Sequence, residues 1–182
     1  MALPRFLYLV PKSLKEACIM LAENEDKARI LAGGTDLLIK MKHGTVKPEF
    51  IIGISNIPNT DYIHVNHKQL TIGANAKISA VAQNCEIRRY FPALAYSASV
   101  TATVQIRNMG TVVGNICNAS PSADTATPLL VYDTNVVIMH PAGERIIPLS
   151  EFFRGPGVNA LESGEIVKEL ILPLTPGRSG SN

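Results

Sequence analysis

The chain has 182 residues, of which 46% are hydrophobic and 18% charged, and its formal net charge is +2. This composition is typical of one globular domain or two small lobes, and it argues against a disordered segment. The small net charge and the lack of any long Lys/Arg block or long apolar run argue against nucleic-acid binding and membrane insertion.

The first 54 residues alternate between predicted strands and helices. Short runs rich in β-branched and aromatic residues predict strands over residues 6–10, 29–32 and 50–54. One helix is expected from Ser13 onwards and a second, shorter one from Leu37 to His43. This β-α-β-α-β order predicts a small, mostly parallel sheet.

Both predicted helices carry signals at their ends. Ser13-Leu14-Lys15-Glu16 matches the capping box, in which the hydroxyl accepts a hydrogen bond from a free N–H and the carboxylate reaches back. In the second helix, Lys40, Lys42 and His43 lie near the C-terminus, where the helix dipole favours cations, and Gly44 can end the helix.

Beyond residue 54 the pattern becomes α+β with antiparallel pairing. Two hairpins are predicted, over residues 62–73 and 135–149, because alternating strands flank short polar turns. Alanine-rich helices are expected over about 78–84 and 92–99, and a final strand over 165–172.

The cysteine positions do not predict a metal site. Cys18, Cys85 and Cys117 are far apart, with no C-x-x-C spacing, which argues against an iron–sulfur cluster or zinc site on this chain. Free, reduced thiols are the simpler interpretation. The first five residues lack the layout of a secretion signal, so we expect a cytoplasmic protein.

A strand leads through two glycines into a helix at Leu31-Ala32-Gly33-Gly34-Thr35-Asp36-Leu37-Leu38. Glycines let the backbone approach a bound group, and the free N–H groups of a first helical turn favour an anion such as phosphate. We interpret Asp36 as the helix cap, because a carboxylate facing phosphates would repel them. From this segment alone, a tight β–α turn without a ligand stays an alternative.

A second segment, from Arg107 to Thr125, is long, polar and rich in glycine and asparagine. Long irregular stretches in compact domains are usually functional or disordered. Apolar anchors at Val112, Val113 and Ile116 favour order, so we expect a functional loop. Neither G-x-G-x-x-G nor G-x-x-x-x-G-K-[ST] occurs, which argues against a Rossmann domain and a P-loop.

The two segments together resemble a family of flavoproteins. Ala32-Gly33-Gly34-Thr35-Asp36-Leu37-Leu38 is similar to the first FAD-diphosphate loop of the molybdenum hydroxylase flavoproteins. Gln105-Ile106-Arg107-Asn108-Met109-Gly110-Thr111-Val112-Val113-Gly114-Asn115, running on to Ser120-Pro121-Ser122-Ala123-Asp124, is similar to the second. This family includes the flavin parts of xanthine dehydrogenase, aldehyde oxidoreductases, aerobic carbon monoxide dehydrogenase and nicotinate dehydrogenase. The resemblance covers essentially the whole chain.

The resemblance implies an α+β, two-lobed FAD-binding domain of the vanillyl-alcohol-oxidase/CO-dehydrogenase flavoprotein type. Extended FAD would lie between an N-terminal lobe (residues 1–54) and a larger lobe (residues 55–176), with backbone amides of both loops around its diphosphate. Asp124 would contact the ribose or diphosphate, and Ile166 or Val167 would line the adenine side. Carried over by position, the expected FAD-binding residues are Ile30, Leu31, Ala32, Gly33, Gly34, Thr35, Asp36, Thr101, Gly110, Thr111, Gly114, Asn115, Asp124, Ile166 and Val167. No catalytic or metal-binding residue is expected.

The resemblance also implies partners. Electrons would arrive from a [2Fe–2S] cluster on an iron–sulfur subunit and leave FAD for an acceptor such as NAD(P)+, while a large molybdopterin subunit would hydroxylate the substrate. Members of the family continue into a third domain. We therefore expect residues 177–182 to begin a domain that is missing or on another chain, and apolar surface to be uncovered near residues 165–174. Two alternatives stay open: a stand-alone flavin oxidoreductase, and a non-enzymatic assembly module of the same fold.

Overall fold

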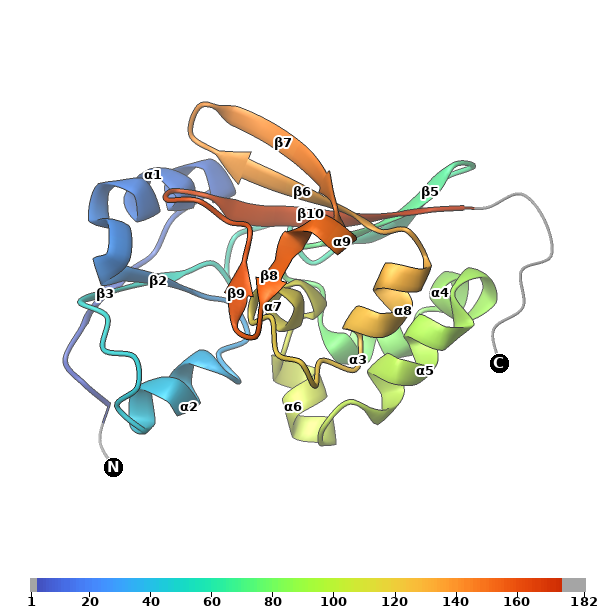
Figure 1. Ribbon diagram of the computed structural model, residues 1–182, viewed down its shortest axis with the longest axis horizontal. Coiled ribbons are helices and arrows are strands. Elements are labelled where there is room, and N and C mark those ends of the chain that lie inside the picture. Colours follow the sequence, from blue (N-terminus) through green and yellow to red (C-terminus); the bar gives the residue numbers. More distant parts are fainter. Residues whose placement is uncertain (1–2, 175–182) are drawn as a thin grey trace.

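Two β-sheets divide the chain into two lobes that lie side by side (Figure 1). The computed structural model describes residues 3–174. Residues 177–182, where a further domain is predicted to begin, lie outside the described residues. We call the part built on the three-stranded sheet the small lobe, and the part built on the five-stranded sheet the large lobe.

The small lobe confirms the predicted alternation of strands and helices. Its elements are β1 (Leu7–Leu9), α1 (Leu14–Asn24), the 3-10 helix η1 (Glu25–Lys27), β2 (Ala28–Leu31), α2 (Leu37–Lys42) and β3 (Phe50–Gly53). The strands are all parallel, in the order β1-β3-β2. The connection through α1 runs across the sheet and that through α2 runs back, so right-handed crossovers place the helices on opposite faces (Figure 1).

The ends of both helices largely follow the sequence signals. The hydroxyl of Ser13 accepts a hydrogen bond from the Glu16 N–H at 3.1 Å, as the capping box predicts. The carboxylate of Glu16 accepts from the backbone N–H of Lys12 at 2.6 Å, one residue before the cap that the motif usually reaches. Helix α2 ends where predicted, because Gly44 follows it with a φ of +73°, a conformation that glycine adopts without strain.

The large lobe is built on an antiparallel sheet whose strand order is β4-β5-β10-β6-β7. Its strands are β4 (Ile63–Val65), β5 (Gln69–Gly73), β6 (Asn135–His140), β7 (Gly143–Pro148) and β10 (Ile166–Pro173). Both predicted hairpins are confirmed, as the pairs β4–β5 and β6–β7. The two hairpins do not pair with each other, because β10 lies between β5 and β6 in the sheet.

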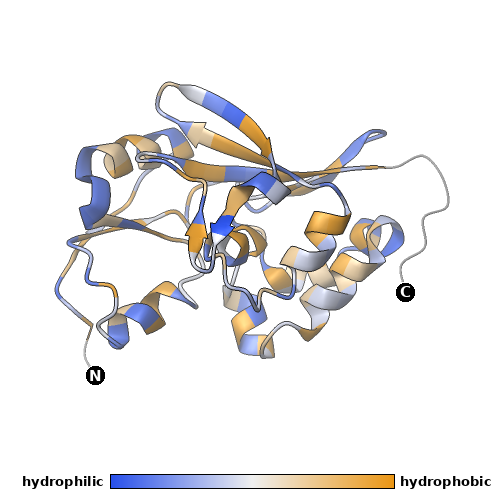
Figure 2. Cartoon of the chain, in the orientation of Figure 1, coloured by the Kyte–Doolittle hydropathy of each residue, from blue (hydrophilic) through white to orange (hydrophobic). Residues whose placement is uncertain are grey.

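The central position of β10 corrects one expectation. We expected apolar surface to be uncovered near residues 165–174, but Ile166, Val167, Leu170 and Leu172 are between 0% and 4% exposed. The strand pairs with β5 on one side and with β6 on the other, and helices cover the face that carries most of these side chains. Its colouring in Figure 2 is accordingly mostly hydrophobic.

Helices cover one face of the five-stranded sheet, and they lie below it in Figure 1. Leu70 and Ile72 of β5 and Leu170 of β10 point into the core that these helices complete, together with Leu94 and Ile116. The remaining elements are α3 (Ile78–Gln83), α4 (Cys85–Tyr90), α5 (Pro92–Val100), α6 (Val104–Met109), α7 (Val112–Cys117), α8 (Ala126–Val131), α9 (Leu149–Phe152), β8 (Phe153–Gly155) and β9 (Val158–Asn159).

The segment from residue 107 to residue 125 is less irregular than predicted, because it contains the end of α6 and all of α7. Each of these helices begins at a threonine. Thr103 accepts a hydrogen bond from the Ile106 N–H at 3.4 Å, and Thr111 accepts from the Gly114 N–H at 3.0 Å. These side-chain caps stabilise two short helices that the hydrophobic periodicity does not reveal.

The two lobes share a second apolar core. Leu14, Ala17 and Cys18 of α1 pack with Ile52 of β3 and with Ile166 of β10. The thiol of Cys18 donates to the carbonyl oxygen of Met139 at 3.4 Å, and burial raises the pKa of this thiol to about 11. Helix α1 is therefore packed between the sheets of both lobes.

Candidate functional site

A cavity of about 610 Å³ lies where the two lobes meet. This volume is in the range of sites for small molecules and cofactors. Its wall contains residues 29–37 of the small lobe, residues 111–124 in part, and the start of β10. All of the expected FAD-binding residues line it except Gly110. Segments that are far apart in the sequence thus meet at one cavity, as the resemblance implies.

The first loop offers backbone donors to this cavity. Gly34 has a φ of +73°, which turns the chain sharply between β2 and α2. Within residues 3–174, the N–H groups of Gly33, Gly34, Thr35 and Asp36 donate to no backbone or side-chain acceptor. Buried or partly buried N–H groups are normally paired, so a run of free donors in a cavity wall indicates a site for an anionic or polar ligand.

The two glycine-bearing loops touch each other. A Cβ on Gly33 would stand 2.7 Å from the Cα of Gly110, and nearer still to the carbonyl oxygen of Met109. A Cβ on Gly110 would stand 3.0 Å from the carbonyl oxygen of Ile106. Gly110 does not line the cavity, but its Cα lies against Gly33, so the two loops can approach this closely only because Gly33 has no side chain.

The second loop is fixed by pairing with the strand-like segment before α3. The Ile78 N–H donates to the Gly110 carbonyl at 3.0 Å, and the Val112 N–H donates to the Ala76 carbonyl at 3.1 Å. The ammonium group of Lys77 donates to the Met109 carbonyl at 3.0 Å, and burial lowers the pKa of this lysine. The backbone of Met109 and Gly110, which faces Gly33, is thus held both by backbone pairing with residues 76–78 and by the Lys77 side chain.

Threonine hydroxyls order the helix that follows this loop. Because Thr111 caps α7, the Gly114 N–H is already used and is not a free donor to a ligand. Asn115 lines the cavity, and its side-chain oxygen accepts from the hydroxyl of Thr125 at 2.7 Å. Thr125 is fully buried, so it constrains the Asn115 side chain from inside the protein. Asp124 lines the cavity and is exposed.

Asp36 does not cap α2 through its side chain, which corrects the sequence interpretation. It occupies the cap position, but its backbone is helical (φ −99°, ψ −49°), whereas a capping residue usually has an extended backbone. Its carboxylate accepts from the side-chain NH₂ of Asn118 at 3.1 Å. The Asn118 oxygen in turn accepts from the ammonium group of Lys40 at 2.6 Å. These three residues all line the cavity and connect the lobes.

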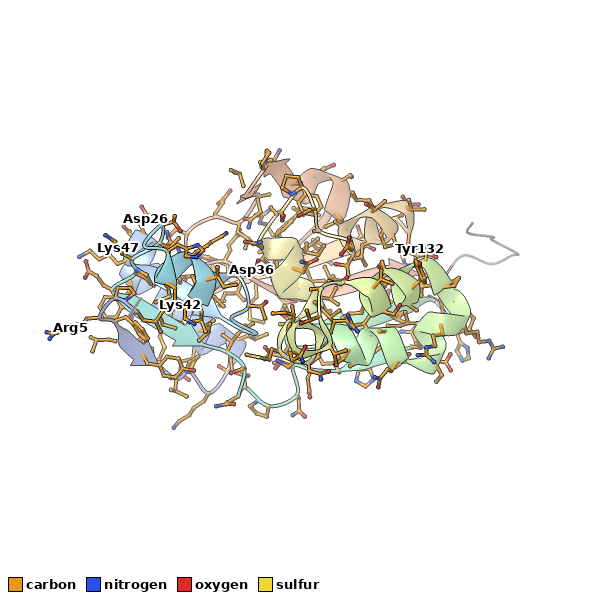
Figure 3. The ribbon with its side chains drawn as sticks, turned by 90° about the horizontal axis from the view of Figure 1, so that it is seen from below. Arg5, Asp26, Asp36, Lys42, Lys47 and Tyr132 are labelled. Atoms are coloured by element: carbon orange, nitrogen blue, oxygen red, sulfur yellow. The ribbon has the colours of Figure 1, made fainter. Side chains whose placement is uncertain are left out.

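Figure 3 shows how this link is placed. Asp36 lies on the side of the small lobe that faces the large lobe, whereas Lys42 and Lys47 lie farther from it. Sequence analysis missed Lys40 as a cavity residue. It included Asn118 only as part of the second segment, because their contact joins residues 78 positions apart.

The start of β10 and the segment before it also contribute to the wall. Ile166 and Val167, both expected at the site, line the cavity together with Leu161 and Glu165, which no sequence signal indicated. The guanidinium of Arg145 makes two hydrogen bonds of 2.7 Å to the Glu165 carboxylate. This pairing lowers the pKa of Glu165 and raises that of Arg145. The pair holds the loop before β10 against β7.

Thr101, a buried residue at the C-terminal end of α5, also lines the cavity. Its hydroxyl donates to the Ser97 carbonyl at 2.7 Å, and its own carbonyl accepts from Arg107 at 3.0 Å. Arg107 also donates to the carbonyl of Ala102 at 2.9 Å, so one guanidinium holds the backbone of both residues.

In the described part of the chain, no cluster of three His, Cys, Asp or Glu side chains could hold a metal ion. Residues 3–174 also contain no helix long and apolar enough to cross a membrane.

The site combines free backbone amides, an exposed carboxylate and apolar side chains. This combination suits a ligand that carries both a phosphate group and an apolar part. Known proteins point the same way. The family described as "FAD binding domain in molybdopterin dehydrogenase" matches residues 4–175. The xanthine dehydrogenase FAD-binding subunit of Escherichia coli O157:H7 is 38% identical over 165 residues, which are 90% of this chain and 56% of that protein. The nicotinate dehydrogenase FAD-subunit of Eubacterium barkeri is 34% identical over 180 residues, 97% of this chain and 61% of that one.

A solved structure shows the same fold. Carbon monoxide dehydrogenase from Hydrogenophaga pseudoflava superposes with a TM-score of 0.93 at 32% identity, covering 96% of this chain and 61% of its own. The predicted two-lobed flavoprotein fold is therefore confirmed. The chain spans little more than half the length of the first curated relative that it matches. It belongs to the family of FAD-binding domains found in molybdopterin dehydrogenases.

Proposed function

We propose that this chain holds FAD, in extended form, in the cavity between its lobes. The observation that carries this proposal is the meeting of both glycine-bearing segments at one cavity. Their contact requires that Gly33 has no side chain, because a Cβ there would stand 2.7 Å from the Cα of Gly110. The donor set also fits the cofactor, because free amides over residues 33–36 suit a diphosphate, and apolar side chains such as Ile166 and Val167 in the wall suit an aromatic ring.

Individual roles follow from this placement. The first loop donates its free N–H groups to the diphosphate, while Thr111 and Asn115 approach it from the second loop. Asp124 accepts a hydrogen bond from a ribose hydroxyl, because its carboxylate is exposed in the cavity wall. Ile166 and Val167 face the adenine, and Thr101 contributes to the wall. Residues 1–54 and 55–176 are, in this proposal, the two FAD-binding lobes.

We further propose that the chain acts as the electron-transfer subunit of a molybdenum-containing hydroxylase in the cytoplasm. When bound, FAD accepts and releases electrons singly or in pairs, and the protein supplies position and electrostatic surroundings. An iron–sulfur subunit would deliver electrons, a large molybdopterin subunit would oxidise the substrate, and an acceptor such as NAD(P)+ would receive the electrons. The names of the relatives, which include medium chains and lettered subunits of several dehydrogenases, support a role inside a complex.

The cofactor assignment is tested with the purified chain. Flavin absorption in the visible range, and FAD released on denaturation and identified by chromatography, are the expected results. A chain that neither retains FAD nor takes it up from solution would refute the assignment. The role in a complex is tested by purifying the tagged chain from its own cells. Recovery of an iron–sulfur protein and a molybdopterin protein would support the role, whereas substrate oxidation by the chain alone would refute it.

A further inference from the structure

The ammonium group of Lys40 lies where the two cofactor loops are joined by side chains. Lys40 is in α2, one turn after the first loop, and it donates to Asn118 at 2.6 Å. Asn118 is the C-terminal cap of α7, the helix that begins at the second loop. Asp36 accepts from the NH₂ group of Asn118 at 3.1 Å and so fixes which end of the amide faces Lys40. The lysine is thus held at the wall by an oriented, neutral acceptor.

Lys40 differs from the other charged residues that line the cavity in the partners that its side chain binds. Two cations line it, and the second, Arg29, directs its guanidinium to the backbone carbonyls of Asp26 and Ala28 at 2.9 and 2.6 Å. Three carboxylates line the cavity: Glu165 is neutralised by Arg145, Asp36 is bound to the Asn118 amide, and Asp124 makes no ion pair among the described residues. Among the described residues that line the cavity, Lys40 is therefore the cation that binds neither a carboxylate nor a backbone carbonyl directly.

We propose that Lys40 is a diphosphate-binding residue of this cavity, and that Asn118, oriented by Asp36, holds its ammonium group ready for the cofactor. This proposal rests on the proposed function. A diphosphate placed at the free amides of residues 33–36 would lie beside the helix that carries Lys40. Ammonium–phosphate contacts are charge-assisted, and a lysine can leave a neutral amide for a phosphate oxygen because its stem is flexible.

If the contact between Lys40 and Asn118 had only a structural role, the expected salt dependence of FAD binding would differ. If Lys40 only tied the lobes together, its charge would not matter once FAD was bound, and salt would affect wild type and variants alike. A contact between Lys40 and the diphosphate is instead weakened by salt, since the screening length falls from about 10 Å at 0.1 M to about 3 Å at 1 M salt.

The chain offers a matched control on the same helix. Lys42 is exposed like Lys40 but does not line this cavity, and it lies away from the large lobe (Figure 3). FAD is titrated into the flavin-free chain at low and high salt, with flavin fluorescence as the signal. Wild type is compared with Lys40→Met, Lys40→Arg and Lys42→Met.

We expect Lys40→Met to raise the Kd for FAD about ten- to hundredfold at low salt, the range of a charge-assisted hydrogen bond. This deficit should shrink at high salt, Lys40→Arg should restore most of the affinity, and Lys42→Met should match wild type. The proposal is overturned if Lys40→Met binds like Lys42→Met, or if its deficit is equal at both salt concentrations. A wild-type chain that binds no FAD would instead overturn the proposed function itself. Since Lys40 is exposed, the variants are expected to fold, and thermal unfolding of the flavin-free proteins checks this.

Discussion

The carbonyl oxygen of Met109 occupies the space that a side chain on Gly33 would need. The Cα of Gly110 stands 2.7 Å from the same point. Since the carbonyl is also held by the ammonium group of Lys77, it cannot easily move aside. The glycine of the first loop is therefore required chiefly by the second loop, and the shape of the cavity depends on this one backbone contact.

Gly33→Ala should consequently separate the two loops. We expect a loss of about 1–3 kcal/mol in the free energy of unfolding, as for other overpacked sites, and strongly weakened FAD binding. Gly155→Ala is the matched control, because nothing lies within 4 Å of a Cβ at Gly155. Urea denaturation and FAD titration of both variants are the measurements. Equal stabilities of the two variants would contradict the contact described above.

Gly34→Val should block FAD binding for a different reason. Gly34 has a φ of +73°, which costs a residue with a side chain about 1–2 kcal/mol, and a Cβ would stand 3.0 Å from the Leu31 side chain. Gly44→Val is the control, since Gly44 has the same φ and its nearest neighbour, the end of Lys47, is 3.6 Å away. Both variants should lose the stability that the positive φ costs, and Gly34→Val should lose somewhat more, because its Cβ also crowds Leu31 and Leu38. Only Gly34→Val should lose FAD, and retention of FAD by this variant would show that the first loop does not bind the diphosphate.

Asp124→Ala should weaken FAD binding by roughly 1–3 kcal/mol, or about five- to hundredfold, because it removes a hydrogen-bond acceptor from the cavity wall. Asp133 does not line the cavity and has a φ of +50°. Asn tolerates this backbone conformation, so Asp133→Asn is a cleaner control than an alanine substitution. Titrations with FAD should show unchanged affinity for the control. Equal losses in both variants would remove Asp124 from the site.

Arg145→Leu should destabilise the chain in a pH-dependent manner. Folding lowers the pKa of Glu165 from its ordinary value of 4.5, mainly through the hydrogen bonds from Arg145. The pair therefore stabilises the fold above that pH, and this contribution disappears as the pH falls through the lower pKa of the folded state. We expect a deficit of about 1–3 kcal/mol at pH 7, because the carboxylate is buried although the Arg145 side chain is 38% exposed.

Urea denaturation of wild type and Arg145→Leu at pH 7 and below pH 4 checks this expectation. The two stabilities should converge in acid. Lys168→Met, which breaks the more exposed pair with Glu144, is the control and should cost less than about 1 kcal/mol. A deficit for Arg145→Leu that stays constant with pH would show that packing of the arginine stem, and not the ion pair, is responsible.

Local signals were sufficient for the order of strands and helices in the small lobe and for the positions of the two glycine-bearing segments. Alternating strands and helices and the capping box at Ser13 are properties of neighbouring residues, and the structure confirms them. The helix α7 was missed because its start depends on one side-chain cap, Thr111, in a segment whose composition resembles a loop. The place of β10 was missed because strand order is a long-range property that the two hairpins do not determine.

Among the residues of the cavity wall, too, those set by local sequence were predicted and those set by distant partners were missed. Residues within the two motifs were predicted because glycine spacing is visible in the sequence. Lys40 and Glu165 were not, since their positions are set by partners far along the chain, Asn118 for the first and Arg145 for the second. The side chain of Asp36 was misassigned for a related reason, because Asn118 competes for the carboxylate that a local motif would use as a cap.

The core shared by the two lobes has a consequence for how the chain folds during synthesis. Leu14 and Ile166 belong to the same apolar cluster although about 150 residues separate them. At ordinary translation speeds, on the order of ten seconds pass between the emergence of α1 and that of β10. During this interval one side of α1 lacks its final neighbours. The packing of α1 is thus completed only after β10 has been made, so chaperones that shield this side of α1 in the meantime should increase the fraction of the protein that reaches the native state.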